Sequence, residues 1–338
     1  MSWYRAIGRP LFFSFSPETA HTIALRLLGL PLPWSAIGGV SDDPALRTTV
    51  AGLSLRNPVV LAAGFDKGCR RLGPLGSLGF GAVVGGTVTS AERDGNAKPR
   101  IARYPERSSM TNAMGLPNPG VEAVAERLAA RRRRGPAAEL VSLADEEASS
   151  VARNLERLHP FVDGFELNVS CPNVSWGRDG DVETHLRDML SAVRHRGATP
   201  LFVKLPPFRS DAERDAVLAL AAVAVEAEAD GVVASNTRPV ADDRLAAGRG
   251  GLSGRAVLSD TLRIVGTLRG ALGPEVPISA SGGIFDGTDA VACLEAGATT
   301  VQIYSALIFE GPGVVGSLTR DIADARGRAE RTAGSAAA

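Results

Sequence analysis

Lysine is rare in this chain, and two of its three lysines stand near the ends of short apolar runs. Lys67 follows the run 58–63, and Lys204 lies in the run 200–205. The stretch 168–173 (NVSCPN) adds two amides and a thiol where another apolar run ends. An ammonium is a compact point charge, and an amide offers both donors and acceptors. Such groups suit a planar, electron-rich heterocycle with imide and carboxylate oxygens.

Other small or polar residues follow the remaining apolar runs and one loop. Alone, each has an ordinary explanation, since loops contain glycine, and a single asparagine is more often a turn residue than a ligand. Their concentration at run ends is what indicates a site. Acidic side chains are nearly absent from these positions, so we expect no metal site. The set comprises Thr87, Asn112, Met114, Gly115, Leu116, Ser235, Asn236, Thr237, Gly282, Gly283, Tyr304 and Ser305.

Eight apolar runs, each bounded by Gly, Pro or Asn, alternate with helix-length segments such as 211–229 and 259–272. Continuous apolar strands between helices predict a parallel sheet that is buried on both faces. Eight such units favour a closed (β/α)8 TIM barrel, in which functional residues gather at the carboxyl ends of the strands. The runs are 58–63, 81–86, 139–143, 164–170, 200–205, 231–235, 276–280 and 299–304.

The turn Gly282–Gly283 and the pair Tyr304–Ser305 follow the seventh and eighth runs, where barrels of this kind bind phosphate. Backbone N–H groups there can hold a cofactor phosphate without side-chain bulk. Lys204 would then lie under the cofactor ring, where a cation stabilises a reduced, anionic flavin. A Schiff-base lysine is the alternative role for Lys204, although the Asn-rich surroundings favour the flavin.

Composition excludes several other classes. Lys and Arg together number 37, as do Asp and Glu, so no charge excess indicates a nucleic-acid partner. Cys69, Cys171 and Cys293 are too few for a disulfide framework and favour a reducing, cytoplasmic compartment. We expect neither a signal peptide nor a membrane-spanning segment, because no apolar run is long enough.

The first forty residues differ from the rest. Ser16-Pro17-Glu18 reads as a helix start, and apolar residues on both sides of it predict two short amphipathic helices. These helices either cap the barrel or form a module for a membrane surface or lipid ligand. We therefore divide the chain into a helical segment (1–40), a barrel (41–325) and a flexible tail (326–338).

Four motifs resemble those of the dihydroorotate dehydrogenases, and the resemblance covers nearly the whole chain. They are 61–67 (LAAGFDK), 168–173 (NVSCPN), 250–254 (GGLSG) and 301–305 (VQIYS). The resemblance implies FMN and the oxidation of dihydroorotate to orotate, with Cys171 as the catalytic base. It implies FMN contacts at Ala62, Ala63, Gly64, Lys67, Thr87, Asn112, Asn168, Lys204, Ser235, Gly251, Gly282, Gly283, Tyr304 and Ser305. It implies substrate contacts at Lys67, Asn112, Met114, Gly115, Leu116, Asn168, Asn173, Asn236 and Thr237.

The chain mixes the two branches of that family. Residues 16–21 (SPETAH) and 98–103 (KPRIAR) are similar to the quinone-linked branch, which is peripheral on the inner face of the cell membrane. That likeness implies a quinone path past His21, Arg103 and Tyr304. The base of that branch is normally Ser, whereas Cys171 and the stretch 112–120 (NAMGLPNPG) look like the soluble branch.

A second departure is Ser142, which stands where the quinone-linked branch has Asn. Losing an amide removes hydrogen bonds worth about 1 kcal/mol each, and this bears on the substrate more than on the flavin. Two further hypotheses stay open beside the leading one. In the first, the chain is a paralogue that acts on another dihydropyrimidine or cyclic ene, or that uses another electron acceptor. In the second, it is a flavin-binding protein that has lost catalysis. Retention of Cys171, Lys67 and Lys204 argues against the last hypothesis.

Overall fold

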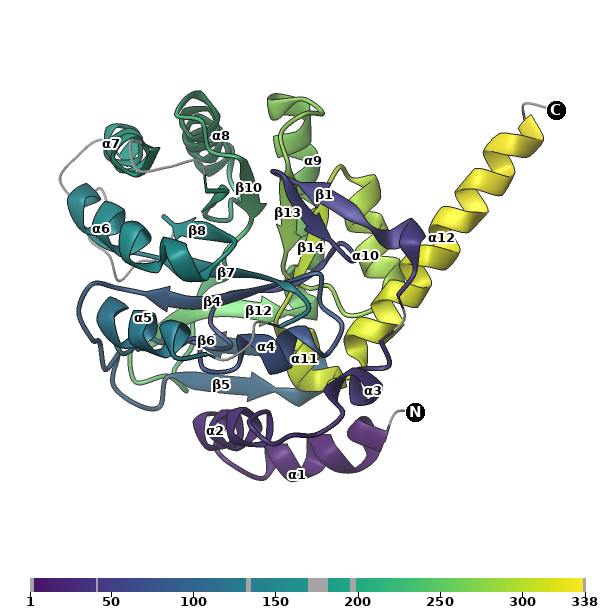
Figure 1. The fold of residues 1–338 in the computed structure, drawn as a ribbon, viewed down its shortest axis with the longest axis horizontal. Coiled ribbons are helices and arrows are strands. Elements are labelled where there is room, and N and C mark those ends of the chain that lie inside the picture. Colours follow the sequence, from purple (N-terminus) through teal and green to yellow (C-terminus); the bar gives the residue numbers. More distant parts are fainter. Residues whose placement is uncertain (1–2, 41, 132–134, 170–181, 195–198, 337–338) are drawn as a thin grey trace.

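The computed structural model describes residues 3–40, 42–131, 135–169, 182–194 and 199–336, with side chains as far as residue 328. Eight parallel strands close into a barrel, with helices around it (Figure 1). The predicted (β/α)8 architecture is confirmed, because each of the eight apolar runs overlaps one barrel strand. In sequence order these are β3 (Val59–Leu61), β4 (Ala82–Val88), β7 (Ala138–Leu143), β8 (Gly164–Asn168), β9 (Leu201–Lys204), β10 (Gly231–Ala234), β13 (Ile278–Ser281) and β14 (Thr300–Ile303).

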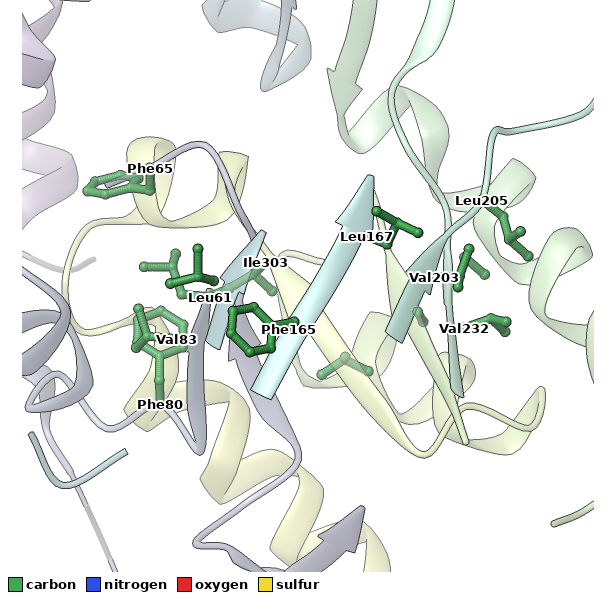
Figure 2. Close-up of a cluster of buried hydrophobic side chains, with 14 of the residues drawn as sticks. Leu61, Phe65, Phe80, Val83, Phe165, Leu167, Val203, Leu205, Val232 and Ile303 are labelled. Atoms are coloured by element: carbon green, nitrogen blue, oxygen red, sulfur yellow. The ribbon is translucent and has the colours of Figure 1, made fainter. Parts of the chain in front are cut away.

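The outer faces of the strands pack against the surrounding helices. Figure 2 shows part of this cluster, with side chains from several barrel strands, among them Leu61, Phe165 and Ile303. Two helices begin with a capping box, built on Ser210 and on Asp286, which satisfies N–H groups of the first turn. The helices are α4 (Leu72–Gly76), α5 (Val121–Ala129), α6 (Ala148–Leu158), α7 (Val182–Arg194), α8 (Asp211–Glu226), α9 (Leu258–Leu272), α10 (Gly287–Glu295), α11 (Ser305–Glu310) and α12 (Val314–Ala336).

A hairpin of β1 (Thr48–Val50) and β2 (Leu53–Leu55) packs against the barrel interior. Its residues Val50 and Leu55 join inward-facing side chains of the strands, such as Val84 and Phe202, in one apolar cluster. The remaining interior space has a volume of about 30 Å³. This space has no room for a ligand of cofactor size.

A second sheet was not predicted from the sequence. It is antiparallel, with the order β11-β12-β6-β5. Its strands are short, and β5, β11 and β12 are only partly buried. β6 is buried, but its residues are mostly polar, so none of the four has the continuous apolar character that marks the barrel strands. Their bounds are β5 (Ile101–Tyr104), β6 (Ser109–Asn112), β11 (Arg238–Ala241) and β12 (Arg249–Gly254).

The helical extension expected before the barrel is present. Ser16 caps the helix α2 (Pro17–Leu27), as its sequence predicted, by accepting a hydrogen bond from the Thr19 N–H (3.3 Å). Helix α2 lies beside β5 (Figure 1). Segments η1 (Tyr4–Gly8) and α1 (Arg9–Phe13) follow each other without a break, so with α2 they form the two helices expected, and α3 (Trp34–Gly38) is an additional short helix. Short single turns complete the chain at η2 (Pro44–Leu46), η3 (Pro105–Arg107), η4 (His159–Phe161) and η5 (Arg255–Val257).

The carboxyl-terminal helix is longer than expected. The residues assigned to a flexible tail, 326–338, continue helix α12 as far as Ala336, and the helix projects away from the barrel (Figure 1). Ala and Arg make up most of this stretch and have high helix propensity, which extends a helix that has already begun. Within the described residues, no helix is both long and apolar enough to cross a membrane.

Candidate active site

The strand register brings the predicted site residues to one mouth of the barrel. Asn168 of β8 is the lateral partner of Lys204 of β9. Ile303 pairs with Leu61, and its carbonyl accepts a hydrogen bond from the Ala62 N–H (3.0 Å), which sets Tyr304 beside the stretch 62–64. Parallel strands in register end at the same edge, so residues far apart in sequence meet here.

A polar network joins four of the strand ends. The Thr87 and Ser142 hydroxyls lie 3.0 Å apart and share a hydrogen bond. Asn168 Nδ2 donates to Thr87 Oγ1 (3.4 Å), and Asn236 Nδ2 donates to Asn168 Oδ1 (3.5 Å). Ser142 is fully buried. Its hydroxyl therefore takes part in orienting the amides of the mouth, although it is shorter than the Asn of the quinone-linked branch.

The turn after β13 requires glycine. Gly282 and Gly283 have φ values of 126° and 80°, which side chains rarely adopt. A Cβ on Gly283 would lie 2.5 Å from the backbone N of Leu258. Gly251 on β12 is equally constrained, because a Cβ there would collide with Thr237. These glycines let backbone amides approach closely, as a phosphate cradle requires.

Lys67 lies in the loop after β3. Its Nζ donates to the Gly64 carbonyl (2.6 Å), and Gly64 N–H donates to the Gly86 carbonyl (2.8 Å), so the loop is tied to β4. Burial, assisted by the Arg100 cation, lowers the pKa of Lys67 to about 8. The ammonium is therefore mostly protonated at neutral pH and loses its charge in mildly alkaline solution.

Lys204 ends β9 and is 7% exposed. Its Nζ lies 3.8 Å from Oε1 of Glu166, which is buried one layer deeper in the barrel. Gln302 Nε2 donates to the other carboxylate oxygen (3.2 Å). Glu166 and Gln302 were not predicted as site residues from the sequence, because each lies inside an apolar run. The signal was available, since each stands two positions before a predicted site residue and so faces the barrel interior.

The second sheet forms one wall of the mouth. Asn112 of β6 pairs with Gly251 of β12, and its Nδ2 donates to the Gly251 carbonyl (3.4 Å). Ser305 Oγ, at the end of the barrel, donates to Ser253 Oγ of β12 (3.1 Å). The loop that follows β6 carries Met114, Gly115 and Leu116, and the Met114 carbonyl accepts a hydrogen bond from the Asn96 N–H (2.9 Å).

An aromatic row joins the N-terminal extension to the mouth. The His21 ring of α2 lies 5.1 Å from the Phe65 ring, and Phe65 lies 5.8 Å from Tyr304. Burial, together with the nearby Lys67 cation, lowers the pKa of His21 to about 4, so the imidazole is neutral at physiological pH. Burial raises the pKa of Tyr304 to about 12. Phe65 was not singled out from the sequence, yet it bridges two residues that were.

Two arginines fasten the extension to the second sheet. Arg100 Nε and Nη2 donate to Glu18 Oε1 of α2 (3.0 and 2.8 Å). Arg103 of β5 lies over the Phe13 ring (4.4 Å) and donates to the carbonyls of Phe12 and Phe13 (3.4 Å each). Arg103 thus lies against residues 12–15 of the extension, and the quinone role assigned to it stays a prediction.

Two predicted site residues, Cys171 and Asn173, lie outside the described residues. Their assignment rests on the motif 168–173, and its first residue, Asn168, is placed at the mouth. The assigned roles of the individual site residues stay predictions.

This chain is similar to dihydroorotate dehydrogenases in both sequence and structure. The family model described as dihydroorotate dehydrogenase matches residues 45–325. A dihydroorotate dehydrogenase (quinone) of Xanthomonas oryzae pv. oryzae is 38% identical, with 98% of this chain and 99% of that protein aligned. One of Flavobacterium lutescens is 37% identical, with 93% and 95% aligned. Among solved structures, DHODH of Eimeria tenella in complex with ferulenol superposes with a TM-score of 0.81 at 28% identity, over 93% of this chain and 92% of that one.

The family model spans most of the barrel, and the relatives are similar over nearly the full length, the N-terminal extension included. The motifs 16–21 and 98–103, which resembled the quinone-linked branch, lie on α2 and at β5, which pack together. The chain therefore belongs to the dihydroorotate dehydrogenase family, on its quinone-linked branch.

Proposed function

We propose that this protein oxidises dihydroorotate to orotate, with FMN as its bound cofactor and a quinone as electron acceptor, in pyrimidine biosynthesis. The observation that carries the proposal is the meeting of Lys67, Asn168 and Lys204 at one barrel mouth in a chain of this family. Two cations and an amide network match a ring that carries a carboxylate and imide oxygens.

The residues at the mouth fit FMN. The positive-φ turn Gly282–Gly283 offers backbone amides to a phosphate, and Ser305 is the first residue of helix α11, which follows the neighbouring strand β14. Lys204 supplies a buried cation for the electron-rich edge of the ring, as flavin sites require. Its ion pair with a carboxylate also supports this role over that of a Schiff-base lysine, which needs a neutral amine.

Each residue then has a task in the proposed reaction. Lys67 pairs with the substrate carboxylate, while Asn168 and Asn236 hold the ring through the hydrogen bonds that orient them. Bound FMN would supply the acceptor for the hydride that leaves C6. Cys171 takes the proton from C5, so that the ring loses one proton and one hydride and gains a double bond.

The aromatic row of His21, Phe65 and Tyr304 supports a quinone path from the N-terminal extension. A neutral His21 favours this path, because an uncharged ring beside the apolar quinone leaves no buried charge unpaired. We propose that residues 1–40 form the quinone-binding segment, and that residues 41–325 form the FMN-binding unit.

Anaerobic addition of dihydroorotate to the purified yellow protein tests the proposal. We expect rapid bleaching of the flavin, and re-oxidation on addition of a water-soluble quinone. Dihydrouracil, which lacks the carboxylate that Lys67 would bind, serves as the comparison. Bleaching by dihydrouracil alone would favour the paralogue, and a flavoprotein that neither compound bleaches would favour lost catalysis. A purified protein that never takes up FMN would refute the proposal.

The N-terminal extension also supports attachment to a membrane surface, on the cytoplasmic face. Among the described residues, the large apolar side chains that are exposed lie between positions 3 and 32, with Val225 as the exception. Helices α1 and α2, which carry Leu11 and Leu27, lie together at one edge of the molecule (Figure 1). Exposed apolar residues grouped in this way mark an interaction site. They are Trp3, Ile7, Leu11, Phe15, Leu27, Leu30 and Leu32.

Replacing Trp3, Ile7 and Leu11 with serine should lower binding to phospholipid vesicles by at least about tenfold, because each buried large apolar side chain contributes about 1.5–3 kcal/mol. Co-sedimentation with vesicles measures the loss, and flavin reduction by dihydroorotate should be unchanged. Val225→Ser is the matched control, since it removes an exposed apolar side chain from α8. Equal vesicle binding by the triple variant and the control would show that the extension only caps the barrel.

A further inference from the structure

A carboxylate is buried inside the barrel, beneath the proposed flavin site. Glu166 is 1% exposed and lies on β8, two positions before Asn168. Side chains two apart on a strand point the same way, so Glu166 occupies the layer directly below the mouth. Burying a carboxylate is costly unless it is paired. Its presence therefore needs an explanation that packing does not give.

The two oxygens of Glu166 are held differently. Oε2 accepts a hydrogen bond from Gln302 Nε2 (3.2 Å). Oε1 is fully buried, and no donor among the described residues forms a hydrogen bond with it. Its nearest cation is Lys204, whose Nζ lies 3.8 Å away. The carboxylate is thus oriented by Gln302 and compensated through space by the Lys204 ammonium.

The apolar surroundings strengthen the electrostatic interaction between Glu166 and Lys204. The interior below is lined by apolar side chains that include Leu140, Phe202 and Val233, and the hairpin residues Val50 and Leu55 close it. Charges in such a setting are screened less than at the surface, so each influences the other and any group above them.

We infer that Glu166 is a positioning residue, which fixes the Lys204 ammonium and offsets part of its charge, and thereby sets the reduction potential of the flavin above it. The inference rests on the proposed binding of FMN. Lys204 favours the anionic reduced flavin, whereas the carboxylate behind Lys204 opposes it. The potential is then a balance between the two charges.

Glu166→Gln separates charge from shape. The amide keeps the volume and can still accept a hydrogen bond from Gln302, but it has no negative charge. We expect the potential to become more positive. At a fixed solution potential, the ratio of reduced to oxidised flavin should rise at least tenfold, which is about 30 mV for a two-electron couple. Anaerobic titration of the holoenzyme against a reference dye measures this ratio without turnover.

Two further variants complete the experiment. Glu166→Asp keeps the negative charge but moves it away from Lys204. The reduction potential should therefore also become more positive, but by less than in Glu166→Gln. This variant tests the inference if Glu166→Gln does not fold. Thr300→Val removes the hydrogen bond from Thr300 Oγ1 to Ser279 Oγ (2.8 Å) in the same interior without changing charge, and should leave the potential unchanged.

An unchanged potential in the Gln and Asp variants would overturn the inference, since it would mean that Glu166 carries no charge or does not reach the flavin. An equal shift in Thr300→Val would also overturn it, because any disturbance of the interior would then suffice. Wild-type protein without FMN is a different failure, because it removes the proposed function itself. The ratio of flavin to protein distinguishes the two.

Discussion

Cys171→Ala is expected to slow the reduction of bound flavin by dihydroorotate by about 10²–10⁴-fold, because that is the usual contribution of a general base. In the wild-type protein the rate should rise with pH until the thiol is ionised, around its unperturbed pKa of about 8.5. Cys171→Ser should retain part of the rate, with its profile displaced to higher pH, since a hydroxyl ionises less readily. Stopped-flow absorbance under anaerobic conditions measures each rate.

Cys293 provides the matched control for this experiment. It is a free, buried thiol on α10, and burial raises its pKa to about 12, so it stays un-ionised over the range tested. In Cys293→Ala, dihydroorotate should reduce the bound flavin at the wild-type rate. If the bound flavin of Cys171→Ala is also reduced at the wild-type rate, the proton goes to another group, and the assignment of Cys171 from its motif is wrong.

Lys67→Met should weaken orotate binding by about tenfold to a hundredfold, since a hydrogen bond to a charged group contributes about 1.5–3 kcal/mol. The wild-type affinity should itself depend on pH. Lys67 has a lowered pKa of about 8, so its positive charge is present below that pH and lost as the pH rises through it. Orotate should therefore bind more weakly above about pH 8. Perturbation of the flavin spectrum during titration with orotate measures the dissociation constant without involving Cys171.

Lys98→Met is the control for charge alone. Lys98 is largely exposed and lies 3.7 Å from Glu18, so its loss removes a lysine from the same side of the molecule but not from the mouth. Orotate affinity should be unchanged in this variant, and the pH dependence should persist. A wild-type pH dependence that also survives in Lys67→Met would assign the ionisation to a different residue.

The barrel was predictable from sequence because its strands are buried on both faces and read as apolar runs. The second sheet was not, since β6 and β12 pair segments far apart in sequence, and neither segment has a marked periodicity. β8 and β14 were predicted as uninterrupted apolar runs, without separating side chains that face the barrel interior from those that face the helices. Glu166 and Gln302, which are polar and face the interior, were therefore not recognised. Phe65 was not singled out for another reason. It lies in a glycine-containing loop, and only the three-dimensional structure reveals its contacts with His21 and Tyr304.

The wall that this second sheet forms also has a consequence for folding. Asn112 and Gly251, which face each other across β6 and β12, are 139 residues apart. Bringing such distant segments together carries a loop-closure entropy that two short strands do not recover by themselves. Because barrel closure brings the two segments together, we expect the wall to assemble after the barrel has closed. Substitutions that destabilise the barrel should then also weaken this wall, even where no residue of the wall is altered.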